Sequence, residues 1–146
     1  ARYIGLGVGK FGVNGSDLTS GTVSGNVVVR CGGNAYMQQQ PALHIGNGGD
    51  GQGVGIVSGV TVQNNTIKNS LYDAVGFSTS TNITLKDNTI DTPGLNGIVI
   101  DPQFYPAPTG SATITGNQVL NLGAAHTAYS NLSQGFMAML SGNSWQ

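Results

Sequence analysis

The chain has 146 residues, a formal net charge of −1 and only 8% charged residues, with 24 glycines and one cysteine. This length fits a single domain, residues 1–146, and apolar residues at regular spacing argue against disorder. The five basic residues are scattered and the apolar runs are short, so the sequence predicts neither a nucleic-acid surface nor a membrane span. A lone cysteine excludes an internal disulfide bond.

The first twenty residues already have the pattern of a strand, and the first copy of a recurring phrase follows them at residues 21–28, Gly-Thr-Val-Ser-Gly-Asn-Val-Val. Cys31 comes shortly after this copy, and we interpret it as a buried structural thiol. Neither end of the sequence predicts an amphipathic helix that would cap a solenoid. Two alternatives are therefore open: the C-terminal part of a longer enzyme, or a subunit whose ends meet other subunits.

The segment between Asn26 and Asn65 is the least regular part of the chain. It is either one long coil or nearly two. Near its start, Tyr36 and three glutamines are suited to recognising sugar hydroxyls. His44 lies between Leu43 and Ile45, so we expect it to point outward from a strand. Because neither histidine has the spacing of a metal ligand, we interpret His44 and His126 as surface or turn residues.

The phrase returns four times after residue 59, with apolar residues at alternate positions. Its later copies occupy residues 60–67, 83–90, 112–119 and, in a worn form, 138–145. Alternation with β-branched residues predicts strands, and a recurring strand-and-turn unit of this length predicts a solenoid.

A four-residue strand can bury its inner face only if a neighbouring coil covers it. Parallel stacking would place equivalent residues about 4.8 Å apart along one axis. The fold class predicted is all-β, a parallel β-helix of about six coils. Two inner columns follow from the alignment of the copies: Val23, Val62, Leu85, Ile114 and Leu140, and Val28, Ile67, Ile90, Val119 and Trp145.

Each copy also carries an asparagine at the bend between its two strands. Asparagine tolerates left-handed backbone, and its amide both donates and accepts hydrogen bonds. We therefore predict that these residues stack as a ladder: Asn26, Asn65, Asn88, Asn117 and Asn143.

The repeated phrase with its asparagine resembles the right-handed parallel β-helix superfamily that includes pectate lyases and polygalacturonases. The resemblance covers roughly residues 20 to 146. It implies the right hand of the coil, and a fold that hosts many polysaccharide-active enzymes.

Two aspartates have equivalent places in the repeat. Residues 50–56 align without gaps on 73–79, and Asn96 follows at the next equivalent position. One column would then hold Asp50, Asp73 and Asn96, with the two carboxylates roughly 5 Å apart. Such a pair suits a glycosidase, since one pKa rises beside the other charge. A calcium site and simple turn capping are the other two readings of the pair.

The main insertion is the proline-rich loop at 101–110. Long loops of a solenoid often line its binding groove. Asp101 begins the loop, and Phe104 and Tyr105 would either stack on sugar rings or pack down on the coil.

Residues 72–74 and 96–108 are similar to the C-terminal β-helix of bacterial α-1,3-glucanases (mutanases), which use clustered aspartates on adjacent coils. Where that family carries a double aspartate, this chain has Asp73 followed by Ala74. The resemblance implies Asp50 and Asp73 as catalytic residues. The substrate-binding residues expected beside them are Asn96, Asp101, Phe104, Tyr105 and Tyr36.

The function predicted is therefore that of a secreted polysaccharide-active glycoside hydrolase, α-glucanase-like, or its C-terminal β-helical part. The alternative is a non-enzymatic extracellular fibre or adhesin subunit. The expected partner is a polysaccharide, with end-to-end self-association or missing N-terminal coils as further expectations. No cofactor is expected, apart from Ca²⁺ in the calcium reading of the aspartate pair.

Overall fold

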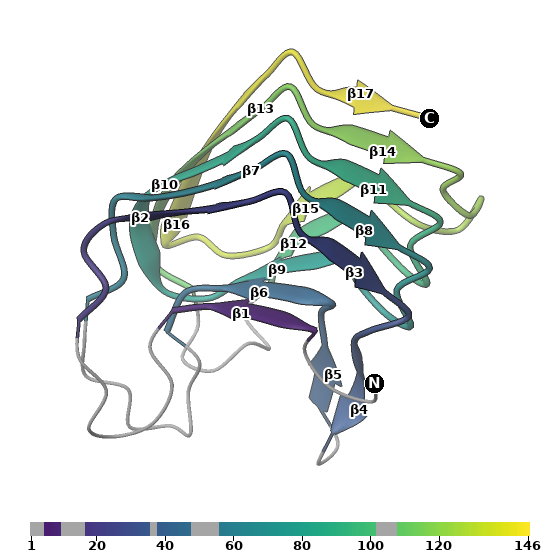
Figure 1. Ribbon diagram of the computed structural model, residues 1–146, viewed down its shortest axis with the longest axis horizontal. Helices are drawn as coiled ribbons and strands as arrows, with labels where there is room; N and C mark the ends of the chain where they lie inside the picture. The colour runs from purple at the N-terminus through teal and green to yellow at the C-terminus, as the bar shows by residue number, and fades with distance from the viewer. Residues whose placement is uncertain (1–4, 10–16, 36–37, 48–55, 102–107) are drawn as a thin grey trace.

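The computed structural model is a coil of short parallel strands in three sheets, and it describes residues 5–9, 17–35, 38–47, 56–101 and 108–146 (Figure 1). Sheet 1 contains β1 (Leu6–Val8), β6 (Leu43–Ile45), β9 (Val75–Phe77), β12 (Ile98–Ile100) and β15 (Tyr129–Asn131). Sheet 2 contains β2 (Gly21–Ser24), β7 (Val60–Gln63), β10 (Ser80–Lys86), β13 (Gly110–Thr115) and β16 (Phe136–Ser141). Sheet 3 contains β3 (Val27–Val29), β8 (Thr66–Lys68), β11 (Thr89–Asp91), β14 (Gln118–Leu120) and β17 (Ser144–Trp145).

Each sheet has five strands, so the described residues form five coils where the sequence predicts about six. The difference lies in the segment between Asn26 and Asn65. These two residues bond directly to each other although 39 positions separate them, so the segment is one long coil. An antiparallel hairpin, β4 (Gly33–Ala35) and β5 (Gln38–Gln40), takes up part of the extra length. No helix in the described ranges has the length and hydropathy of a membrane span.

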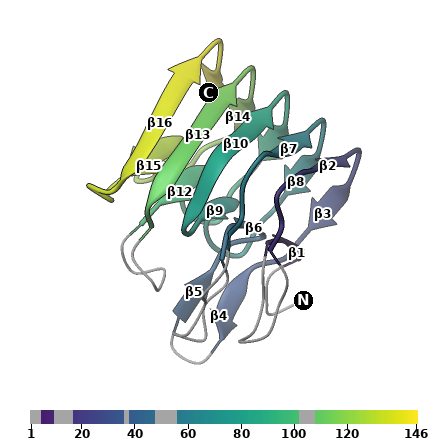
Figure 2. The ribbon, with the colours of Figure 1, turned by 90° about the vertical axis from the view of Figure 1, so that its left-hand side faces the viewer.

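The register confirms both predicted inner columns. Val62 pairs with Val23 on one side and with Leu85 on the other, and Ile67 likewise lies between Val28 and Ile90. Figure 2 shows the strands of sheet 2 side by side along the axis. In the middle coils these inward side chains are fully buried. Burial of one such side chain contributes about 1.5–3 kcal/mol.

The predicted asparagine ladder is present at the bend between sheets 2 and 3. The backbone N and the Nδ2 of Asn65 both donate to Oδ1 of Asn88, each at 3.0 Å. Asn88 donates in the same way to Asn117, and Asn117 donates to Asn143. The second Nδ2 hydrogen reaches backbone carbonyls, such as those of Val62 and Lys86 beside Asn88. Buried amides therefore keep their hydrogen bonds, which burial requires.

The left-handed backbone at this bend belongs to the residue before each ladder asparagine, not to the ladder asparagine itself. The residues concerned, with their φ angles, are Gly25 (69°), Asn64 (53°), Asp87 (53°), Gly116 (65°) and Gly142 (59°). The residue before each ladder asparagine therefore makes the turn, and the asparagine side chain makes hydrogen bonds to the neighbouring coils. A second left-handed column ends the strands of sheet 3: Arg30, Asn69, Thr92 and Asn121.

Cys31 is half-buried and packs against the core at the N-terminal coil. Its Sγ lies 3.4 Å from the carbonyl oxygen of Val29. The thiol is therefore less buried than predicted.

Candidate functional site

Asp73 lies at the turn that leads from sheet 3 into β9 of sheet 1. It is 3% exposed, and its Oδ1 accepts both the backbone N–H and the Nδ2–H of Asn96, each at 3.0 Å. Asn96 Oδ1 accepts in turn the backbone N–H of Thr127 at 2.9 Å and its Oγ1–H at 3.1 Å. Asp73, Asn96 and Thr127 therefore form a second, short ladder at the entrance to sheet 1. The predicted stacking of Asn96 on Asp73 is confirmed, and Thr127 is a member that the repeat alignment missed.

The first aspartate of the predicted column, Asp50, lies outside the described residues. The coil before Asp73 presents a different residue at that level. Leu43 pairs with Val75, and the backbone N of Ala42 donates to the carbonyl of Asp73 at 3.0 Å. These bonds place Pro41 one coil before Asp73.

The ungapped alignment of 50–56 on 73–79 is therefore wrong at its aspartate end. Ser58 does bridge to Thr81, 23 positions on, as that alignment requires. However, Leu43 pairs with Val75, 32 positions on. Nine extra residues thus stand between β6 and Ser58, and they break the repeat there.

Burial dominates the electrostatics of Asp73. Loss of water raises the pKa of its carboxyl above the usual range, and the two hydrogen bonds from Asn96 only partly oppose this. The charge of Asp101 raises this pKa further, whereas His126 lowers it. Because Oδ1 already accepts two hydrogen bonds, a retained proton is best placed on Oδ2. Asp73 therefore holds its proton to a higher pH than an exposed aspartate does.

The groups that act on Asp73 come from other coils. Asp101 follows β12 and is half-buried, at the opposite end of the strand from Asn96. His126 precedes Thr127, and a turn bond from its backbone N to the carbonyl of Gly123, 2.9 Å long, fixes its backbone. In the described structure, Nδ1 of His126 is buried and has no hydrogen-bond partner. His126 is therefore a half-buried turn residue, in agreement with the prediction, and its charge also acts on Asp73.

His44 points outward from β6, as predicted, but the prediction that it is exposed is wrong. It is 6% exposed, and its Nε2 lies 3.1 Å from Oγ of Ser78. Ser78 donates its only hydroxyl hydrogen to the carbonyl of Asn47 at 2.9 Å. His44 must therefore donate to Ser78, so it is not placed to take a proton from that serine. Burial lowers the pKa of His44 to about 4, and the ring is neutral at pH 7.

The remaining predicted site residues, Tyr36, Phe104 and Tyr105, lie outside the described residues together with Asp50. Within the described ranges, no three His, Cys, Asp or Glu side chains are close enough to hold a metal ion. Calcium binding involving Asp50 remains a prediction.

The family model described as a right handed beta helix region matches residues 7–144 of the chain. No curated protein sequence matches it.

Solved structures of GH87 α-1,3-glucanase catalytic domains have a similar fold. One is a complex with nigerose, and it matches with a TM-score of 0.81 and 20% sequence identity, over 97% of this chain and 29% of that chain. A complex with tetrasaccharides matches with the same values. This chain therefore spans less than a third of the length of the glucanase chains that it matches.

Proposed function

Because the chain belongs to the family of right-handed β-helix regions, and because it presents a buried carboxyl beside other titratable groups, we propose that it is the β-helical part of a polysaccharide-active glycoside hydrolase. The substrate class is an α-1,3-linked glucan, the class of polymer named for the glucanases whose fold it shares. Such polymers lie outside the cell, so the proposal includes secretion.

The observation that carries the proposal is the state of Asp73. A glycosidase needs one carboxyl that stays protonated near neutral pH and a second that stays ionised. Burial raises the pKa of Asp73, and two hydrogen bonds from Asn96 hold its orientation. We assign Asp73 the role of the general acid, which donates its Oδ2 proton to the departing glycosidic oxygen.

The second carboxylate is either Asp101, whose charge already acts on Asp73, or Asp50, which lies outside the described residues. In either role the ionised group would attack the anomeric carbon directly or activate a water molecule. The charge of His126 favours the ionised form of Asp73. It would therefore stabilise the carboxylate that remains after Asp73 has donated its proton.

The test compares Asp73→Asn, Asp50→Asn and Asp101→Asn with the unmodified chain for release of reducing sugar from α-1,3-glucan. Loss of a general acid or its partner lowers turnover by about 10²–10⁴-fold. Asp73→Asn and one of the other two variants should show this loss with an unchanged circular dichroism spectrum. Asp87→Asn is the matched control, because Asn64 already occupies the same left-handed position one coil earlier. Unaltered turnover in Asp73→Asn would remove this residue from the mechanism.

A further inference from the structure

The outer face of sheet 2 has two kinds of side chain. Its central column has a threonine on each of the strands β2, β7, β10 and β13. On the last strand, β16, Met139 takes this position and pairs with Thr113. A neighbouring column runs from Ser111 on β13 to Met137 on β16. This face looks sideways from the axis along which the coils stack (Figure 2). Further coils at either end would therefore leave it open.

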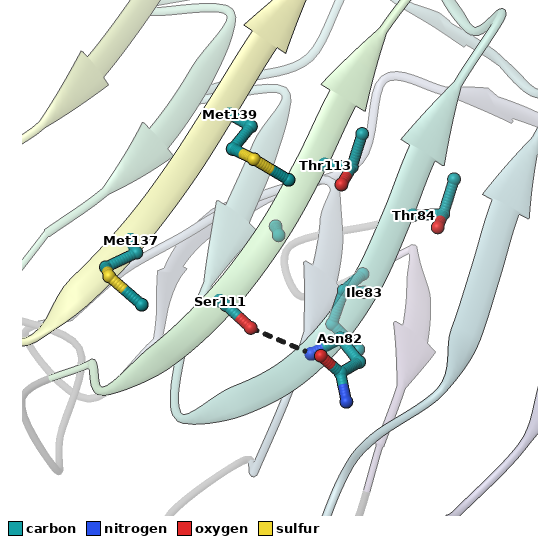
Figure 3. A pocket seen from close by; sticks show the side chains of 8 residues that line it. Asn82, Ile83, Thr84, Ser111, Thr113, Met137 and Met139 are labelled. Carbon is teal, nitrogen blue, oxygen red and sulfur yellow. Dashed lines mark hydrogen bonds between the residues drawn. The ribbon is translucent and has the colours of Figure 1, made fainter.

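A cavity of about 300 Å³ lies on this face (Figure 3). We call it the methionine groove. The residues that line it are Asn82, Ile83, Thr84, Ser111, Ala112, Thr113, Met137 and Met139. No lining residue carries a charge, and the volume is at the lower end of the range for small-molecule sites.

The two methionines are unusually exposed for their type. Met137 is 74% and Met139 is 68% exposed, although both side chains are apolar. Neighbouring apolar side chains that face water often mark a binding surface, and methionine adapts its shape to its ligand. The groove is therefore able to bury apolar ligand surface against β16.

Hydroxyl and amide groups form the opposite side of the groove. Oγ of Ser111 accepts the backbone N–H of Asn82 at 3.0 Å, the bond drawn in Figure 3. That bond fixes the serine oxygen and leaves its O–H to donate. Thr84 and Thr113 pair on adjacent strands, and neighbouring strands of a sheet lie about 4.8 Å apart.

We propose that the methionine groove is a carbohydrate-binding site, separate from the site around Asp73. A neutral sugar has a face of C–H groups and a rim of hydroxyls, and the groove matches both. The C–H face would lie on Met137 and Met139, while the rim would bond to Ser111, Thr84 and Thr113. The lack of charge in the lining favours a neutral glycan over an acidic one. Only the choice of an α-1,3-linked probe depends on the proposed hydrolase function.

The test follows the ¹³C-labelled methionine methyl signals of the whole chain by NMR during titration with nigero-oligosaccharides and, separately, cello-oligosaccharides. At least one series should shift the Met137 and Met139 signals to saturation, because both side chains line the groove. Met137→Ala combined with Met139→Ala removes these signals, so its binding is measured by isothermal titration calorimetry. It should be at least about tenfold weaker than that of the parent, because most of the apolar contact is lost. Thr113→Val should weaken binding by a smaller factor.

Leu132→Ala is the matched control, since Leu132 is 62% exposed and lies outside the groove. It should leave the titration unchanged. Asp73→Asn should also leave the methyl shifts intact, even where it abolishes hydrolysis. Three results would overturn the proposal: no shift with either sugar series, loss of the shifts in Asp73→Asn, or shifts that depend on protein concentration without sugar. The last result would assign the groove to a second copy of the chain.

Discussion

Thr92 and Asn121 stand one coil apart at the same corner, with the same left-handed backbone at φ of 53° and 54°. Asparagine accepts this conformation readily, whereas a β-branched side chain does not. Asn69 fills the position on the other side of Thr92, also at positive φ. Thr92 is therefore the residue of this column whose side chain fits its backbone worst.

Replacing Thr92 with asparagine should stabilise the protein. We expect Thr92→Asn to raise the free energy of unfolding by about 0.5–1 kcal/mol, because it relieves the strained backbone. Urea denaturation at pH 7 measures the change. The reverse substitution one coil earlier, Asn69→Thr, should lower stability by a similar amount. Equal stability of both variants and the parent would show that this corner carries no strain.

The centre of the asparagine ladder should be far more sensitive than its end. Asn88→Ala removes the Oδ1 that accepts two hydrogen bonds from Asn65, and the Nδ2 that donates to Asn117 and to backbone carbonyls, while the backbone N–H of Asn88 still donates to Asn117. Two buried donors of Asn65 are left without this acceptor, so we expect a loss of about 3–5 kcal/mol. Thermal and urea unfolding provide the measurement.

Asn26→Ala is the control for that loss. Asn26 is exposed at the end of the ladder and donates only to Asn65 and to the carbonyl of Ser24. Its removal should cost about 1 kcal/mol. Equal losses at the two positions would contradict the view that burial makes the ladder important.

His44 should make the protein less stable in mild acid. Its pKa falls from 6.5 to about 4 on folding, so between these values the unfolded chain binds more protons than the folded one. The stabilisation is complete above pH 6.5 and is lost as the pH falls towards 4, by roughly 3 kcal/mol in total. Urea midpoints measured from pH 7 to pH 4 test this, and His44→Asn should flatten the profile in that window. A profile that keeps its slope in the variant would assign the effect to another group.

The 146-residue chain should associate end to end. Strands β16 and β17 pair on one side only, and they leave Leu140 45% and Trp145 41% exposed. Unpaired strand edges next to exposed core invite a further chain. The ladder also has a direction, with Asn143 at one end and Asn26 at the other, which favours head-to-tail contact.

Light scattering at micromolar concentration should detect species larger than 14.9 kDa. Leu140→Gln combined with Trp145→Gln should shift the distribution towards monomer, while the outward Met137→Gln should not. A monodisperse monomer across the concentration range would exclude this mode of association.

The sequence predicts the inner columns and the ladder because a parallel register depends on the spacing within each copy. Val62, Ile67 and Asn65 have the same spacing as Leu85, Ile90 and Asn88, and the structure pairs them accordingly. The alternation of apolar and polar residues along each copy therefore becomes an alternation of side chains that point into the core and side chains that point to solvent.

The failures come from positions where the repeat is interrupted. The extra residues between β6 and Ser58 have no counterpart in the next coil, so an ungapped alignment misplaced the aspartates. The burial of His44 and the influence of His126 on Asp73 depend on contacts between coils. No local pattern in the sequence reports such contacts.

The ladder has a consequence for how such a protein can change over time. Asn65, Asn88 and Asn117 each give two donors to the next coil and receive two from the previous one. A whole coil is therefore an interchangeable module, and duplication of a segment such as 66–88 would restore every bond that its insertion breaks. Gain or loss of a few residues is tolerated only at the corners. Genes for such proteins should accordingly vary in length by entire coils, with smaller insertions confined to the loops that carry the chemistry.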